Sequence, residues 1–310
     1  MLRVRGVMVA VCAAAALAMT GIGAGVAQAA PPPLPNVLPN VLPKIPGLPT
    51  PPPPVDLGKS FNKLTKQINK SIPGRVGVAI TATGTGEPVF FGTVKNARAW
   101  STLKAPVAVA AERAHVAGLT PLETKAIRDS DNESAEAIWG SLGSTQQAID
   151  AATAVLRDGG DYRTVISSEL SRPKSYPGAT PWATTDQSVF AANMPCLAGA
   201  ENVLKFMSSV GPNQKWGVAK QRKGVRSAVK GGWGPVSDAT GKYVVRQLGV
   251  ITTNRGQVGV SLVALPASGT FEDGTAMLTR VGDWVQRNLQ HLPSGHCAPT
   301  VPAPPAPGPQ

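Results

Sequence analysis

The sequence predicts an α+β fold in which one antiparallel sheet, built from both ends of the chain and flanked by helices, lies beside an all-helical lobe. Strand-like runs occur at 75–83 and 88–94, and again at 227–233, 242–253 and 257–265. The stretch between these two groups carries helix signals instead. A sheet divided around a helical insertion leaves a cleft between sheet and lobe, and a functional site is expected there.

Periodicity and capping residues predict the helices. Ser101 can cap a helix, and Thr120 and Ser144 each begin a capping box. Apolar residues recur at helical spacing in the first and last helices, and lysines occupy the other faces of the first. Helices are therefore expected over 57–72, 101–118, 119–158, 200–210 and 277–289. Residues 160–185 are rich in proline and read as a long irregular loop.

The two ends of the chain differ from its body. Residues 1–29 combine two arginines, an apolar run and a small-residue triplet, which is typical of a secretory signal peptide. A transmembrane anchor is the alternative, but glycines break the run and no charged stop follows. The proline-rich segments 30–56 and 296–310 predict an extended linker and a disordered tail, because proline lacks an amide donor. The folded domain is expected over 57–295.

Composition limits the partners. The 310 residues are 42% hydrophobic, which is ordinary for a chain that buries a core, and the formal charge is +12. No nucleic-acid-reading module is recognisable, so the charge favours anionic cell-wall polymers or membrane surfaces over nucleic acid, or is simply a solvated surface. We expect a protein that is secreted or held in the cell envelope, without stable membrane insertion. Cys196 and Cys297 remain after signal removal, and an oxidising compartment favours a disulfide between them.

Three short motifs fall in a fixed order along the body. The pattern S-x-x-K starts at Ser60, Ser101, Ser171 and Ser227, so context must choose among these positions. The Ser101 copy stands at a predicted helix start, where both side chains would share one face. It is followed by S-D-N at 130–132, between helices, and by K-G-G at 230–232, on a strand.

The spacing of Ser101 and Lys104 suits covalent catalysis. A lysine with a lowered pKa can take the proton of the serine hydroxyl, and amides at a helix N-terminus favour developing negative charge. The alternative is that Ser101 is only a helix cap and Lys104 only a surface charge. The S-D-N sequence is likewise good turn and cap chemistry between helices.

With these motifs, and with GRVGVAITATGTGE as a first strand and turn, the chain resembles the class A β-lactamase and D-alanyl-D-alanine peptidase superfamily of penicillin-recognising serine hydrolases. The resemblance covers nearly the whole body and suggests a divergent, exported, actinobacterial-type member. It implies that Ser101 is the acylated nucleophile, that Lys104 is its base or proton relay, and that Ser130 passes a proton to the leaving nitrogen. It also implies an oxyanion hole from the amides of Ser101 and Trp233, and a substrate site made by Asn132, Lys230, Gly232 and Trp233.

The sequence also departs from that family. Gly231 replaces the usual threonine or serine, whose hydroxyl helps bind the substrate carboxylate; Ser237 or Arg246 could compensate. Glu169 lies near the position of the glutamate that activates the deacylating water, but the E-x-x-L-N pattern is incomplete, so an ordinary exposed loop glutamate is the alternative. The interval from Ser101 to Ser130 is short for the family, which predicts a more open cleft.

The leading hypothesis is an exported, monomeric serine hydrolase that acts on β-lactams or D-alanyl cell-wall peptides through a Ser101 acyl-enzyme. One alternative is a catalytically weak or inactive protein that binds peptidoglycan or a protein partner, and a further one is an esterase. No cofactor or metal is expected, because the histidines lack zinc-ligand spacing and no glycine loop matches a nucleotide cradle.

Overall fold

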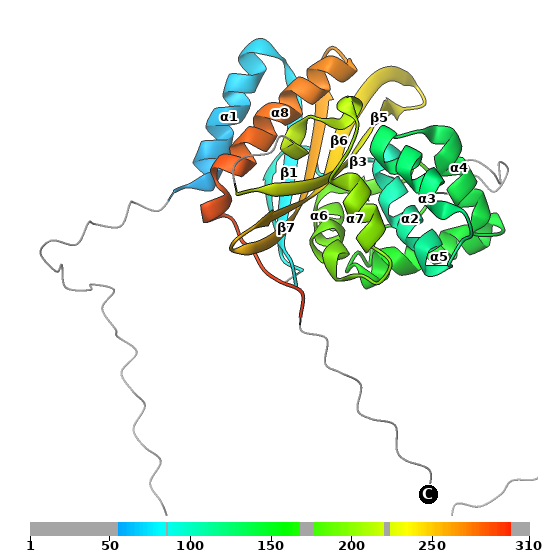
Figure 1. The fold of residues 1–310 in the computed structure, drawn as a ribbon. Helices are drawn as coiled ribbons and strands as arrows, with labels where there is room; N and C mark the ends of the chain where they lie inside the picture. The colour runs from blue at the N-terminus through cyan, green and yellow to red at the C-terminus, as the bar shows by residue number, and fades with distance from the viewer. Residues whose placement is uncertain (1–54, 85, 168–175, 220–223, 299–310) are drawn as a thin grey trace, which may run out of the picture. The chain divides into compact units, whose positions relative to one another are not determined.

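The computed structural model describes residues 55–84, 86–167, 176–219 and 224–298, and its centre is a five-stranded antiparallel sheet (Figure 1). The order across the sheet is β2-β1-β7-β6-β5. The strands are β1 (Gly74–Ala82), β2 (Pro88–Gly92), β5 (Arg226–Ser237), β6 (Thr240–Thr253) and β7 (Gly256–Pro266). The predicted α+β class, with one sheet assembled from both ends of the chain, is confirmed.

The pairing of β1 with β7 joins the two ends. Its register runs from Gly74 opposite Pro266 to Ala82 opposite Val258. Nearly every residue of both strands is buried, as expected for central strands covered on both faces.

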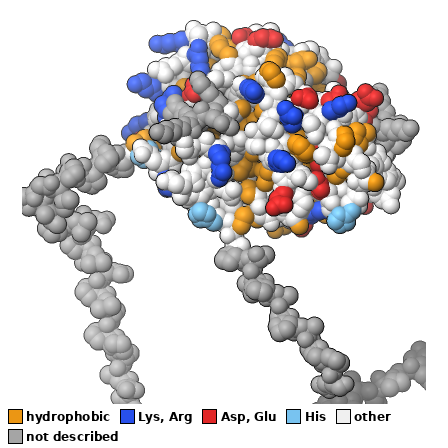
Figure 2. Space-filling model, viewed as in Figure 1, with side chains coloured by type: hydrophobic (Ala, Val, Ile, Leu, Met, Phe, Trp, Pro, Cys, Tyr) orange, Lys and Arg blue, Asp and Glu red, His pale blue; other side chains and the backbone are white. Residues whose placement is uncertain are grey.

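Helices cover the two faces of the sheet. Helices α1 (Leu57–Ser71) and α8 (Phe271–Arg287) share one apolar core with Leu262 of β7. The neighbouring Ser261 points the other way and bonds to Gln187 of α6 (Thr184–Asn193). The lysines of α1 lie on its exposed side, and Figure 2 shows basic side chains along that edge of the body.

The helical lobe stands beside the sheet and has its own apolar core (Figure 1). Its helix α2 is buried almost all round, so it forms the centre of the lobe. The helices are α2 (Lys104–Arg113), α3 (Leu119–Glu123), α4 (Asn132–Ser141), α5 (Thr145–Asp158) and α7 (Glu201–Met207). A π-helical segment, η2 (Thr124–Asp129), links α3 to the S-D-N turn.

The predicted helix caps and element boundaries agree only partly with the structure. The capping box at Ser144 is present. The box expected at Thr120 is wrong: α3 begins at Leu119, after Gly118 in a left-handed conformation, so Thr120 already lies inside the helix. Helix α2 ends at Arg113 rather than at Gly118. The loop expected over 160–185 contains a short strand, β4 (Pro181–Ala183), that pairs with β3 (Asn96–Arg98).

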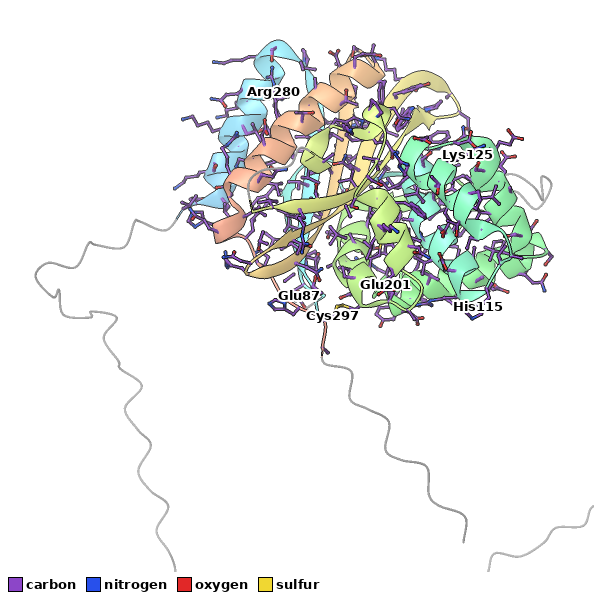
Figure 3. The ribbon with its side chains drawn as sticks, viewed as in Figure 1. Glu87, His115, Lys125, Glu201, Arg280 and Cys297 are labelled. Carbon is purple, nitrogen blue, oxygen red and sulfur yellow. A yellow bond between two sulfur atoms is a disulfide. The ribbon has the colours of Figure 1, made fainter. Side chains whose placement is uncertain are left out.

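The C-terminal end is tied to the body. Cys196, at the end of the 3-10 turn η3 (Met194–Cys196), forms a disulfide with Cys297, which Figure 3 shows at the edge of the body. Gly295 also bridges to Gln257 at the start of β7. The described chain therefore continues past the expected boundary at 295.

The predictions for the chain ends lie mainly outside the described residues. The signal peptide over 1–29, the linker up to residue 54 and the tail from residue 299 all fall there. In the part of the chain that is described, no helix has both the length and the apolar character needed to cross a membrane.

Removing the disulfide should destabilise the protein. Because the bridge closes a sequence separation of 101 residues, a C196S/C297S variant should lose roughly 4 to 5 kcal/mol of unfolding free energy. Urea denaturation checks this, and dithiothreitol should affect the wild type but not the variant. A loss below about 1 kcal/mol would contradict the prediction.

Candidate active site

Ser101 lies in a 3-10 turn, η1 (Trp100–Leu103), that leads directly into α2. The residue before it, Trp100, has a positive φ of 45°, which is strained for a bulky side chain. The loop after residue 175 holds it in place: the Trp100 amide donates to the Gly178 carbonyl at 2.7 Å, and the Ala99 amide donates to Thr180 at 2.7 Å. Strain of this kind persists where surrounding structure enforces it, and it clusters at functional sites.

The edge strand β5 passes directly beside this turn. A Cβ atom at Gly232 would lie 2.7 Å from the Ala99 carbonyl oxygen and 3.1 Å from the Ser101 nitrogen, so only glycine allows this approach. Gly231 directs its N–H and C=O away from β6, toward Gln214 and Lys230. Because backbone groups alternate sides along a strand, the Trp233 N–H lies on the same outer edge. The amides predicted to form an oxyanion hole thus come from two adjoining elements.

Lys104 is buried rather than a surface charge, with 2% of its area exposed. Its Nζ donates to the carbonyls of Ser130 at 2.7 Å and Asp131 at 2.9 Å, and to Asn132 Oδ1 at 2.9 Å. Burial lowers the pKa of Lys104 to about 8, although the negative charges of Asp131 and Glu136 partly oppose that shift. With this pKa, about a tenth of the Lys104 side chains are neutral at pH 7.

The S-D-N sequence forms a tight turn between η2 and α4. The backbone of Ser130 has a left-handed helical conformation, with φ 61° and ψ 29°. Asp131 caps α4, since its Oδ1 accepts from the Ser134 amide at 2.7 Å, and the hydrogen bonds from Ser134 lower the pKa of Asp131. Asp131 thus has a structural role, while Ser130 and Asn132 flank Lys104.

Lys230 reaches Ser130 from the opposite side. Its Nζ donates to Ser130 Oγ at 2.9 Å, to Gln214 Oε1 at 2.5 Å and to the Gly231 carbonyl at 2.9 Å. Lys230 is fully buried, and burial, followed by the nearby charge of Lys104, lowers its pKa. Because Ser130 Oγ accepts from Lys230, its own proton remains free to be donated elsewhere.

Gln214 completes the cluster and was not predicted. It is fully buried; its Nε2 donates to the carbonyls of Ile127 and Arg128, and its Oε1 accepts from Lys230 and from the Gly231 amide. All of its hydrogen-bonding capacity is thus used to join η2 to β5. A single glutamine in a loop carries no sequence motif, so only the fold reveals this role.

Arg246 does not compensate for Gly231. It is fully buried, and its guanidinium donates to the carbonyls of Ala97 and Trp182 and to Gln187 Oε1. Burial lowers its pKa to about 9. Its side chain lies beneath η1 because Arg246 pairs with Gly232 and therefore shares the face that Gly232 turns toward Ala99. Ser237, which pairs with Thr240 beyond an irregularity in β5, is not part of the cavity described next.

A cavity of about 360 Å³ opens beside Ser101. Ser101 and Asn132 both line it, together with Glu136, one turn further along α4. The remaining lining residues are Arg98, Trp100, Ser167, Tyr176, Pro177, Gly178, Ala179 and Asp238. Glu169 lies outside the described residues, but Ser167, the last described residue before it, lines the cavity.

Other candidates stay apart from this cluster. The hydroxyl of Ser60 accepts from Trp284 in the core between α1 and α8, and the S-x-x-K pair at 171–174 lies outside the described residues. Ser227 is buried on β5. His115 is exposed at the outer end of the lobe, as Figure 3 shows.

Comparison with solved structures identifies the fold. A class A β-lactamase from Mycobacterium abscessus superposes with a TM-score of 0.58 at 18% identity, over 74% of this chain and 98% of that one. An ancestral class A β-lactamase gives 0.56 at 20% identity, over 75% and 99%. The chromosome-encoded β-lactamase of Vibrio parahaemolyticus gives 0.56 at 15% identity, over 76% and 99%.

The chain therefore has the fold of class A β-lactamases. No protein-family model matches it, and no curated protein matches it by sequence. Because one fold can host unrelated activities, the chemistry has to be argued from the site residues themselves.

Replacing Gln214 should weaken the whole cluster. A Q214M variant removes one hydrogen-bond partner each from Lys230, from the Gly231 amide and from the carbonyls of η2, so it should lose roughly 2 to 4 kcal/mol of unfolding free energy. Gln146 is exposed on α5 and its side chain donates to Asp150, so Q146M is the matched control, with a change within about 0.5 kcal/mol. Denaturation curves of both variants give the two unfolding free energies. Equal losses in Q214M and Q146M would refute the bridging role of Gln214.

Proposed function

We propose that the chain is an exported serine hydrolase that transfers an acyl group to Ser101 and then to water. The observation that carries the proposal is the position of Ser130: its turn accepts from Lys104 on one side, and its hydroxyl accepts from Lys230 on the other. This arrangement supplies a base for the nucleophile and a proton donor for the leaving group.

The proposed acylation step uses Ser101, Lys104, Ser130 and Lys230. Neutral Lys104 takes the proton of the Ser101 hydroxyl as Oγ attacks the substrate carbonyl carbon. The resulting oxyanion accepts hydrogen bonds from the backbone amides of Ser101 and Trp233. Ser130 then gives its proton to the leaving nitrogen or oxygen, and Lys230 replaces that proton through its hydrogen bond to Ser130 Oγ. The leaving group departs and an ester remains on Ser101.

Deacylation needs a base that activates water. Glu169 is the proposed base: it follows closely on Ser167, which lines the cavity over Ser101. Asn132, also on that cavity wall, would bind an amide of the acyl portion. The acyl donors that the family resemblance implies are β-lactams and D-alanyl wall peptides, and an ester is the further candidate.

A second candidate function is a non-catalytic protein that binds peptidoglycan. The three hydrogen bonds of Lys104 favour it, because each is donated to an acceptor other than the Ser101 hydroxyl and so suits a permanent ammonium. Saturable binding to purified peptidoglycan that survives S101A and K104M, without any covalent adduct on the wild type, would select this function.

A fluorophosphonate should label Ser101. This probe forms a bond to an activated serine oxygen with loss of fluoride, so intact mass spectrometry should show one adduct, and peptide mapping should locate it at Ser101. The S101A variant should show none. The matched control is S227A, which removes another S-x-x-K serine; its hydroxyl is buried without a partner in the described structure, so labelling should be retained. Absence of an adduct on the wild type would refute the proposed chemistry.

The labelling rate should depend on pH through Lys104. Since the neutral form is the base and its pKa is about 8, the rate should rise with pH up to that value and fall roughly tenfold for each unit below it. The K104M variant should lose about 10²-fold to 10⁴-fold and its pH dependence. Lys125 is exposed on the same lobe (Figure 3), so K125M should behave as wild type. A flat profile from pH 6 to 8 would exclude Lys104 as the base.

A further inference from the structure

The position that binds the substrate carboxylate in the resembled family is filled by aromatic rings here. A Cβ atom on Gly231 would lie 2.8 Å from Trp216 Cζ2 and 3.3 Å from Trp233 Cζ3. Both rings pack on Phe271, with centroid distances of 6.4 Å from Trp216 and 4.9 Å from Trp233. Trp216 is buried and its Nε1 donates to the Asn213 carbonyl. A threonine or serine cannot be placed at 231 without moving this packed indole.

The nearby cations are already engaged. An ammonium has three N–H donors, and Lys230 directs its three hydrogen bonds at Ser130, Gln214 and Gly231. The Gly231 amide is likewise taken by Gln214. Arg246 is fully buried and bonds inward. A substrate carboxylate would therefore have to break one of these buried hydrogen bonds to gain its own.

The charges that line the cavity over Ser101 also disfavour an anion. Glu136 and Asp238 both face it, and Arg98 is the cation among the lining residues. Arg98 is held by Asp238 at 2.7 Å. A bound carboxylate would thus meet two carboxylates and a guanidinium that is already paired.

We propose that this site accepts acyl donors that carry no carboxylate on the leaving group, such as neutral esters, in preference to carboxylate-bearing β-lactams and D-alanyl peptides. The inference rests on the proposed Ser101 acyl chemistry and narrows its substrate class. Trp216 is the residue that determines this specificity, because its ring occupies the space that a carboxylate-binding hydroxyl needs. The bond broken is the acyl–oxygen bond of the ester: its oxygen leaves with the proton of Ser130, and water later releases the acid.

A matched pair of esters tests the preference. The purified wild type is given the phenyl ester and the 3-carboxyphenyl ester of phenylacetylglycine, which differ only by the carboxylate on the leaving group. We expect kcat/KM for the phenyl ester to be at least about tenfold higher. Equal values, or faster turnover of the carboxylate ester, would overturn the proposal. So would no turnover of either ester by a protein whose Ser101 still reacts with fluorophosphonate, whereas loss of the fluorophosphonate adduct itself would refute the proposed function.

Variants identify the cause of the preference. A W216L/G231T double variant opens the space and adds the hydroxyl, so kcat/KM for the carboxylate ester should rise at least about tenfold relative to the phenyl ester. The W216L single variant opens the space without the hydroxyl, and its ratio should stay near that of the wild type. Thermal unfolding verifies that both variants fold; if they do not, the ester pair on the wild type still decides. An unchanged ratio in a folded double variant would remove Trp216 from its proposed role.

Discussion

Two buried lysine side chains hold the turn at Ser130, and the rest of the site depends on this interaction. Lys104 comes from the central helix of the lobe and Lys230 from the edge strand of the sheet. Burying an amino group is unfavourable unless its donors are satisfied, so each lysine keeps its acceptors and neither element can shift alone. Gln214 extends the same constraint to η2 and to the Gly231 amide. The lobe and the sheet are therefore fixed relative to each other at the point where the chemistry is proposed.

The cations around η1 and the carboxylates of the cavity act on different stages of the reaction. Lys104, Lys230 and Arg246 are buried, and within the described chain none of them forms a salt bridge. In the proposed reaction Lys104 becomes positive when it takes the Ser101 proton, at the stage when an oxyanion would develop. The carboxylates line the cavity above Ser101, where a substrate would first bind. A charge arrangement of this kind favours the transition state over an anionic ground state, which is the requirement for catalysis.

Much of the fold and part of the site could be predicted from the sequence, for a physical reason. Alternating apolar runs at both ends of the chain and a helical middle predict the α+β class. The motif residues Lys104, Ser130 and Lys230 meet because their spacing matches those elements, and Ser101 lines one cavity with Asn132. The start of α3 differs from the prediction because Gly118, in a left-handed conformation, is the residue before the helix, and Thr120 lies inside it. The direction of Arg246 depends on the register of β6 with β5, which no local pattern encodes. Trp216 and Gln214 contact residues that are distant from them in the sequence, so these contacts arise from tertiary packing alone.

The pairing of β1 with β7 has a consequence for how the chain acquires its structure. Gly74 needs Pro266 as its partner, so the central strand pair brings together residues from opposite ends of the body. A chain that emerges N-terminus first, from a ribosome or through a membrane channel, offers β1 only the short β2 as a neighbour until nearly the whole body has followed. Long-range strand pairing of this kind is slow and comes late. The helices of the lobe can therefore form as they emerge, whereas the β1–β7 pair forms last. The complete sheet, which carries Lys230 on β5, is assembled only then.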